Sequence, residues 1–191
     1  MNIVERVKNI IMTPKTEWDV IAGEATQPKD LVITYVLPLA ALAAIAGFIG
    51  TVVIGSFFFG HLSFVWGLVA LAWHLIMSVV SVFVIGFVID ALAPNFGGEK
   101  NFQQAIKVAA FFPTAAWVAG IFSLIPALAI LGILGSLWSL YLLYCGLEPL
   151  MKAPEDKSVA YTVVVIIVAI VLSVVIATIA ALAMPARTRG F

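Results

Sequence analysis

Five long apolar runs dominate this chain of 191 residues, and each run is long enough to cross a lipid bilayer. An α-helix rises about 1.5 Å per residue, so about 20 apolar residues cross a hydrocarbon core of about 30 Å. Backbone groups inside lipid find no water to bind, so such runs fold as helices. The runs cover residues 31–55, 62–92, 105–124, 126–147 and 160–184. The sequence therefore predicts an all-α integral membrane bundle with five transmembrane helices.

Composition supports a membrane environment and argues against nucleic-acid binding. Hydrophobic residues make up 63% of the chain and charged residues 10%, whereas soluble domains have about 45–50% and about 25%. The formal net charge is zero, so the chain lacks the basic surface that nucleic acids require. We predict contact with membrane lipid and with a protein partner or a second copy of the chain, and no nucleic-acid partner.

The distribution of Lys and Arg predicts an orientation in the membrane. With five spans and a cytoplasmic N-terminus, eight basic residues lie inside and two lie outside, as the positive-inside rule favours. We therefore predict a multi-pass protein of a bacterial cytoplasmic (inner) membrane with its N-terminus in the cytoplasm. Arg187 and Arg189 in the short C-terminal tail, residues 185–191, oppose this orientation. A re-entrant run in place of one span would move that tail inside.

The N-terminal segment, residues 1–30, has the pattern of two short helices. Thr13 and Pro14 predict an N-cap and the first turn of a second helix that stops near Gly23. Trp18 in that helix suits the lipid headgroup region. The segment either lies on the membrane surface or packs against cytoplasmic loops. The first helix is amphipathic, with its apolar face formed by Ile3, Val4, Val7, Ile10 and Ile11.

Polar side chains form a stripe in the second span. His74, Ser78 and Ser81 share one helical face because their spacing is four and then three. An intramembrane polar stripe can line a proton or ion path, so a small channel or transporter is the alternative function. Hydrogen bonding between helices explains the same stripe equally well. Lys107, one turn into the third span, can reach the interface by snorkelling.

The connection between the second and third spans is the candidate cytoplasmic contact loop. Gly97 and Gly98 predict a turn, and Asn101 followed by Gln104 predicts a helix start. We expect Asp90, at the end of the second span, to reach headgroups or water. The residues assigned to the loop are Asp90, Asn95, Gly97, Gly98, Glu99 and Lys100.

Small residues recur at four-residue spacing in three places. Such spacing lets the backbones of membrane helices approach closely, so these residues predict helix-contact faces without implying a dimer. The three sets are Ala43, Gly47 and Thr51; Gly132 and Ser136; and Gly135 and Ser139.

Motifs of enzymes and of cofactor sites are absent from the sequence. The chain contains no G-x-S-x-G, no phosphate-binding glycine loop and no H-E-x-x-H. The single cysteine, Cys145, excludes an intrachain disulfide and a cysteine-rich metal site, and it is predicted to pack as a small hydrophobe. We predict no enzymatic activity, no cofactor and no catalytic or metal-binding residues.

Three stretches of the chain together resemble the Yip (Ypt-interacting protein) family, especially its bacterial branch. They are TPKTEWDVIAGE, FGGEKNFQQAIKVAAFFPTAAWVAGIFSLIP and SLWSLYLLYCGLEPLMKAP. The resemblance implies five membrane helices and a cytoplasmic N-terminus. The leading hypothesis for the function is a non-enzymatic protein that acts in membrane organisation through partner or lipid contacts. Eukaryotic relatives bind Rab-type small GTPases in vesicle traffic. Their long cytosolic N-terminal region is replaced here by residues 1–30, so Rab binding is not carried over.

Overall fold

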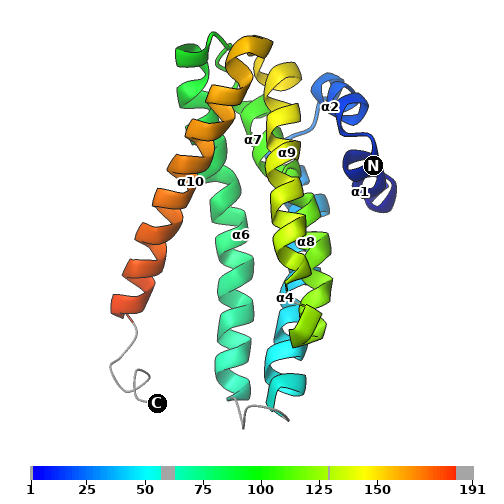
Figure 1. Ribbon diagram of the computed structural model, residues 1–191, viewed down its shortest axis with the longest axis vertical. Coiled ribbons are helices and arrows are strands. Elements are labelled where there is room, and N and C mark those ends of the chain that lie inside the picture. The colour runs from blue at the N-terminus through cyan, green and yellow to red at the C-terminus, as the bar shows by residue number, and fades with distance from the viewer. Residues whose placement is uncertain (1, 57–62, 129, 184–191) are drawn as a thin grey trace.

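The computed structural model describes residues 2–56, 63–128 and 130–183, which are mainly helical with no β-strand among them. Five of its helical segments are long and apolar enough to cross a membrane, which confirms the predicted fold class. Figure 1 shows these segments running along a common direction as a bundle. The C-terminal tail, residues 185–191, lies outside the described residues. The five segments are Pro28–Ile54, Phe64–Phe96, Phe102–Leu124, Leu131–Met151 and Glu155–Val174.

The first two spans pack closely through a glycine. Gly67 lies so near Val52 and Phe48 that any side chain at its position would overlap them. The second span exceeds the about 20 residues that a bilayer requires, so we expect it to tilt or to project beyond the hydrocarbon. The elements of the first span are α3 (Pro28–Leu31), the π-helix η1 (Val32–Val36), α4 (Leu37–Phe48) and the π-helix η2 (Ile49–Ile54). The second comprises α6 (Phe64–Leu92) and the 3-10 turn η3 (Ala93–Phe96).

The third span is broken at Pro113, although the sequence predicted one continuous run. Proline has no N–H to donate to the carbonyl four residues earlier, so the helix stops. The Ala116 N–H donates instead to Ser139 Oγ at 3.0 Å. Thr114 Oγ1 donates to Phe111 O at 2.5 Å. The resulting elements are α7 (Phe102–Phe111), α8 (Thr114–Ala119) and the 3-10 turn η4 (Gly120–Leu124).

Replacing Ser139 by alanine is expected to lower the free energy of unfolding by about 1–3 kcal/mol, because the Ala116 N–H loses its acceptor inside the bundle. The measurement is unfolding of the purified protein in detergent micelles titrated with dodecyl sulfate. Ser136→Ala is the matched control: Ser136 is exposed and donates only to Gly132 O of its own helix. Its effect is expected to stay within about 0.5 kcal/mol. Equal losses in both variants would contradict this role of Ser139.

The fourth and fifth spans are α9 (Leu131–Met151) and α10 (Glu155–Ala183). The sequence placed the start of the fourth span at Pro126, but Pro126–Leu128 forms a separate 3-10 turn, η5. Gly135 lies against Ala115 and Ala119 of α8, so the contact predicted there is present. Gly132 makes no such contact within the described part of the chain, because no described neighbouring atom lies within 4 Å of the position a side chain would occupy.

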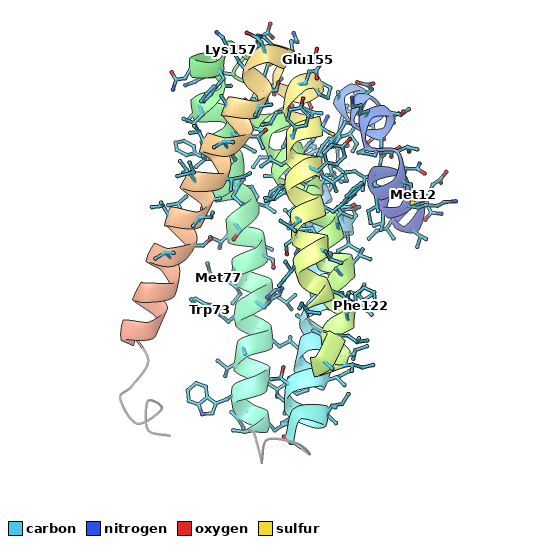
Figure 2. The ribbon with its side chains drawn as sticks, in the orientation of Figure 1. Met12, Trp73, Met77, Phe122, Glu155 and Lys157 are labelled. Atoms are coloured by element: carbon cyan, nitrogen blue, oxygen red, sulfur yellow. The ribbon has the colours of Figure 1, made fainter. Side chains whose placement is uncertain are left out.

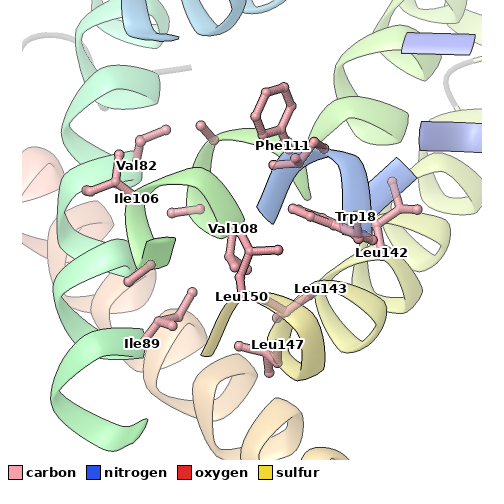
Figure 3. Close-up of a cluster of buried hydrophobic side chains, with 14 of the residues drawn as sticks. Trp18, Val82, Ile89, Ile106, Val108, Phe111, Leu142, Leu143, Leu147 and Leu150 are labelled. Carbon is pink, nitrogen blue, oxygen red and sulfur yellow. The ribbon is translucent and has the colours of Figure 1, made fainter. Parts of the chain in front are cut away.

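The third span lies at the centre of the bundle, with 61% of its most apolar window buried against 17% for the second span. The core gathers where this span meets α9 and the N-terminal helices, as Figure 3 shows for Trp18, Phe111 and Leu142. Two short helices, α1 (Ile3–Met12) and α2 (Pro14–Gly23), lie beside the bundle. They stand near the end at which α6 leads into α7 and α9 into α10 (Figure 1).

Candidate functional site

The N-terminal pair, which we define as helices α1 and α2, docks on the bundle through Trp18. The Trp18 side chain is fully buried, and its ring meets the Phe111 ring edge-on at a centroid distance of 6.2 Å. Gly146 of α9 provides the space, because a Cβ there would stand 2.8 Å from the indole. The predicted headgroup position of Trp18 is therefore wrong: the indole is a core side chain.

A buried ion-pair network holds the N-terminal pair together. Arg6 of α1 is buried, and its Nη1 lies 2.5 Å from Glu17 Oε1 of α2. Its second nitrogen, Nη2, is bonded to Glu24 Oε1 just beyond α2. The guanidinium also stands 5.8 Å from the centroid of the Phe111 ring, a cation–π arrangement. Charges removed from water require such partners, so the network fixes the angle between the two helices.

Lys107 ties the N-terminal pair to the third span. Its side chain is buried, and Nζ donates to Ile21 O at 3.0 Å and to Glu24 O at 2.5 Å. Gln104 adds a bond from Nε2 to Ala22 O at 2.9 Å. The last carbonyls of a helix have no partner within it, and a cation there complements the helix dipole. The expected snorkelling of Lys107 is therefore wrong, because protein carbonyls bind its ammonium group.

Two large apolar side chains on the outer side of α1 are uncovered. The bundle buries Arg6 and Ile10, whereas Val4 and Met12 are each 72% exposed. Met12 points away from the bundle in Figure 2. Thr13 does not cap α2 as predicted, because its hydroxyl donates to Asn9 O at 3.0 Å. The N-terminal pair therefore packs on the membrane spans themselves, and the outward side of α1 carries Val4 and Met12 together with the exposed Glu5 and Lys8.

The predicted turn at Gly97 and Gly98 is present. It lies in the connection between α6 and α7 and contacts the connection between α9 and α10. Gly97 adopts the left-handed conformation with φ of 76°, which favours glycine. Gly98 approaches Met151 O so closely that a Cβ would stand 2.7 Å from it. Glu99 donates its N–H to Met151 O at 2.8 Å, and its carboxylate pairs with Lys152 at 2.7 Å. The loop is thus held against the connection between α9 and α10.

The residues assigned to the candidate contact loop do not all share one surface. Asn95 and Lys100 are exposed at this end, and Asn101 caps α7 as predicted by accepting from Gln104 N–H at 3.1 Å. Asp90 is separate, since its Oδ1 is buried in the described structure without a hydrogen-bond partner. The expectation that Asp90 reaches headgroups or water is wrong for that oxygen.

The polar stripe of the second span meets the break in the third span. His74, Ser78 and Ser81 line one cavity of about 290 Å³, whose opposite wall includes Pro113 and Trp117. The Ser78 hydroxyl donates to His74 O of its own helix at 2.8 Å. His74 also lines a larger cavity of about 770 Å³ between α4, α6 and the α8–η4 segment. The side chains of the stripe therefore line cavities between helices.

Chemical groups suited to metal binding do not converge in the part of the chain that the structure describes. No group of three or more His, Cys, Asp or Glu side chains lies close enough there to hold a metal ion. Cys145 is buried in α9, in keeping with its predicted packing as a small hydrophobe.

The long-range contacts of the N-terminal pair left no local signal in the sequence. Arg6 and Glu17 are 11 residues apart, and Lys107 is 86 residues from Ile21. The one available hint was the position of Lys107 inside an apolar run, because a buried lysine needs acceptors.

Comparison with known proteins identifies a family-level match. A family model described as the Yip1 domain matches residues 8–177, which include all five described spans and most of the N-terminal pair. Neither a curated protein nor a solved structure matches the chain.

Proposed function

Because the chain belongs to the Yip1 domain family, we propose that it is a non-enzymatic protein that organises a bacterial inner membrane through lipid or partner contacts. We place the contacts on the outward side of the N-terminal pair, near the end of the bundle at which the Glu99–Lys152 ion pair joins two connections. The observation that carries the proposal is the exposure of two large apolar side chains of α1, Val4 and Met12, beside the membrane spans.

Charge placement supports a cytoplasmic position for this end. The N-terminal segment contributes Arg6, Lys8, Lys15 and Lys29. The connections and helix ends nearby add Lys100, Lys107, Lys152 and Lys157. Basic residues concentrate on the cytoplasmic side of membrane proteins, so we place the N-terminus inside. Arg187 and Arg189 lie in the part of the chain that is not described.

The amphipathic character of α1 suggests that lipid is the first contact. The helix lies alongside α8 rather than over the end of the bundle, and we place it at the level of the bilayer interface. Burying one large apolar side chain contributes about 1.5–3 kcal/mol, so inserting Val4 and Met12 would stabilise the docked helix substantially.

The channel alternative has less support than the lipid contact. The hydroxyl of Ser78 in the stripe, and those of Thr51 and Ser123 nearby, donate to carbonyls within their own spans and not to a path for ions.

A fluorescent label at position 12 is expected to report lipid contact. Met12→Cys carries an environment-sensitive nitrobenzoxadiazole label in the full chain, reconstituted in vesicles, with Cys145→Ala as background. Its emission should shift to the blue and be quenched by nitroxide-labelled lipids, because apolar groups of an interfacial helix enter the acyl boundary. The same label on Thr16→Cys, exposed on α2, should remain water-like. Water-like emission from both sites would refute lipid contact by α1.

A further inference from the structure

Two cavities lie next to each other along α6, and we refer to them together as the furrow. They share His74 and Trp117 in their linings, and together they follow α6 from Ser63 to Ile85. At about 1.5 Å per residue, this stretch is about 33 Å long, close to the hydrocarbon thickness of about 30 Å. Ala70 and His74 are both exposed, so the furrow opens sideways from the bundle toward lipid.

His74 stands deep within this furrow. Along the helix axis, His74 lies about 15 Å from the start of α6 at Phe64 and about 24 Å from Asp90. We therefore place it near the middle of the bilayer. A neutral imidazole has one donor and one acceptor nitrogen. Among the described residues, the imidazole has no hydrogen-bond partner. A polar group left unpaired in hydrocarbon is costly, so the site favours a ligand that supplies a polar atom at this depth.

The depth and the lining restrict the chemistry of that ligand. Phospholipids carry their headgroups and ester carbonyls at the interface, about 15 Å away. Neither cavity is lined by Asp, Glu, Lys or Arg, so a charged ligand would find no counter-ion. A neutral ring bearing a carbonyl can remain near the bilayer centre and accept the imidazole N–H. Small residues leave space beside it for an apolar tail: Ala43, Gly47, Ala70 and Gly120.

We propose that this furrow binds a membrane quinone, with a ring carbonyl on the His74 imidazole and the ring beside Trp117. The tail follows the larger cavity between α4 and α6. Its volume of about 770 Å³ lies in the range of about 300–1,000 Å³ typical of small-molecule sites. This site lies inside the bilayer and is independent of the lipid contact proposed for α1.

The test is titration of the purified full chain in nanodiscs with decylubiquinone, followed by quenching of tryptophan fluorescence, since Trp66 and Trp117 line the furrow. We expect saturable quenching. His74→Phe should weaken binding about tenfold, as expected for one lost hydrogen bond in an apolar site, whereas His74→Gln should keep much of it. Decylbenzene, which has the same tail and no carbonyl, should compete at least tenfold more weakly.

Filling the furrow provides a second variant that does not touch the imidazole. Ala70→Leu places an isobutyl group in the cavity lining and should weaken decylubiquinone binding. Ala72→Leu, exposed on α6 outside both linings, should bind as the unchanged chain does. Thermal unfolding of each variant confirms that it folds. Equal affinity in His74→Phe and the unchanged chain, equal affinity in both leucine variants, or equal competition by decylbenzene would each overturn the proposal.

Discussion

Replacing Trp18 by alanine is expected to lower the free energy of unfolding by about 3–5 kcal/mol and to release the N-terminal pair from the bundle. The indole is fully buried and packs against Phe111 and Gly146. The alanine variant would leave a cavity between α2 and α9. Unfolding in dodecyl sulfate measures the stability, and limited trypsin digestion at Lys8 and Lys15 measures the release.

A second substitution approaches the same contact from α9. Gly146→Val places side-chain carbons where the indole now lies, with the first of them 2.8 Å from Trp18. Overpacking of this kind costs about 1–3 kcal/mol or more. In the double variant the valine occupies the space that the indole leaves, so its total loss should be smaller than the sum of the two single losses.

The control for both variants is Trp73→Ala. Trp73 is half exposed on α6 and projects from the bundle in Figure 2, so its removal should change stability by about 1 kcal/mol or less. A Trp18→Ala variant that is as stable and as resistant to trypsin as Trp73→Ala would contradict the docking role of the indole. Strictly additive losses in the double variant would contradict the contact between Trp18 and Gly146.

Features set by local chemistry were predictable from the sequence. Run length alone identifies five spans because the bilayer demands helices of about 20 residues. Gly97 and Gly98 indicate their turn because few other residues adopt a positive φ. Asn101 indicates a helix start because its side chain can accept an N–H that the helix leaves free. Each of these predictions depends on residues close together in the chain.

Features set by contacts between distant residues were not predictable. Trp18 suits a headgroup region as well as a core, and the choice depends on Gly146, which lies more than 100 residues away. The sequence correctly predicts that α1 is an amphipathic helix. The side of that helix that meets α2 includes Arg6, whose partners Glu17 and Glu24 lie in α2 and just beyond it. For His74, the stripe was visible in the sequence, but the smaller cavity beside it is lined by Pro113, at the break in the third span.

Replacing Arg6 by leucine is expected to lower the free energy of unfolding by about 3–5 kcal/mol, the cost of leaving a buried charge without its partner. Glu17 has only 10% of its side chain exposed, so its carboxylate cannot regain water while the N-terminal pair stays docked. Glu24 is more exposed and can rehydrate. The measurement is unfolding in dodecyl sulfate, together with trypsin cleavage at Lys8 and Lys15.

The double variant Arg6→Leu with Glu17→Gln separates the cost of an unpaired charge from the value of the pair. With the carboxylate replaced by a neutral amide, it should recover more than half of the lost stability, because well-packed neutral groups often replace a buried pair at little cost. Lys152→Leu is the matched control, since it breaks the exposed pair with Glu99. Exposed pairs contribute about 0–1 kcal/mol, and salt screens them more than buried pairs. If Arg6→Leu cost no more than Lys152→Leu, or if the double variant recovered nothing, the Arg6–Glu17 pair would not be what holds α1 against α2.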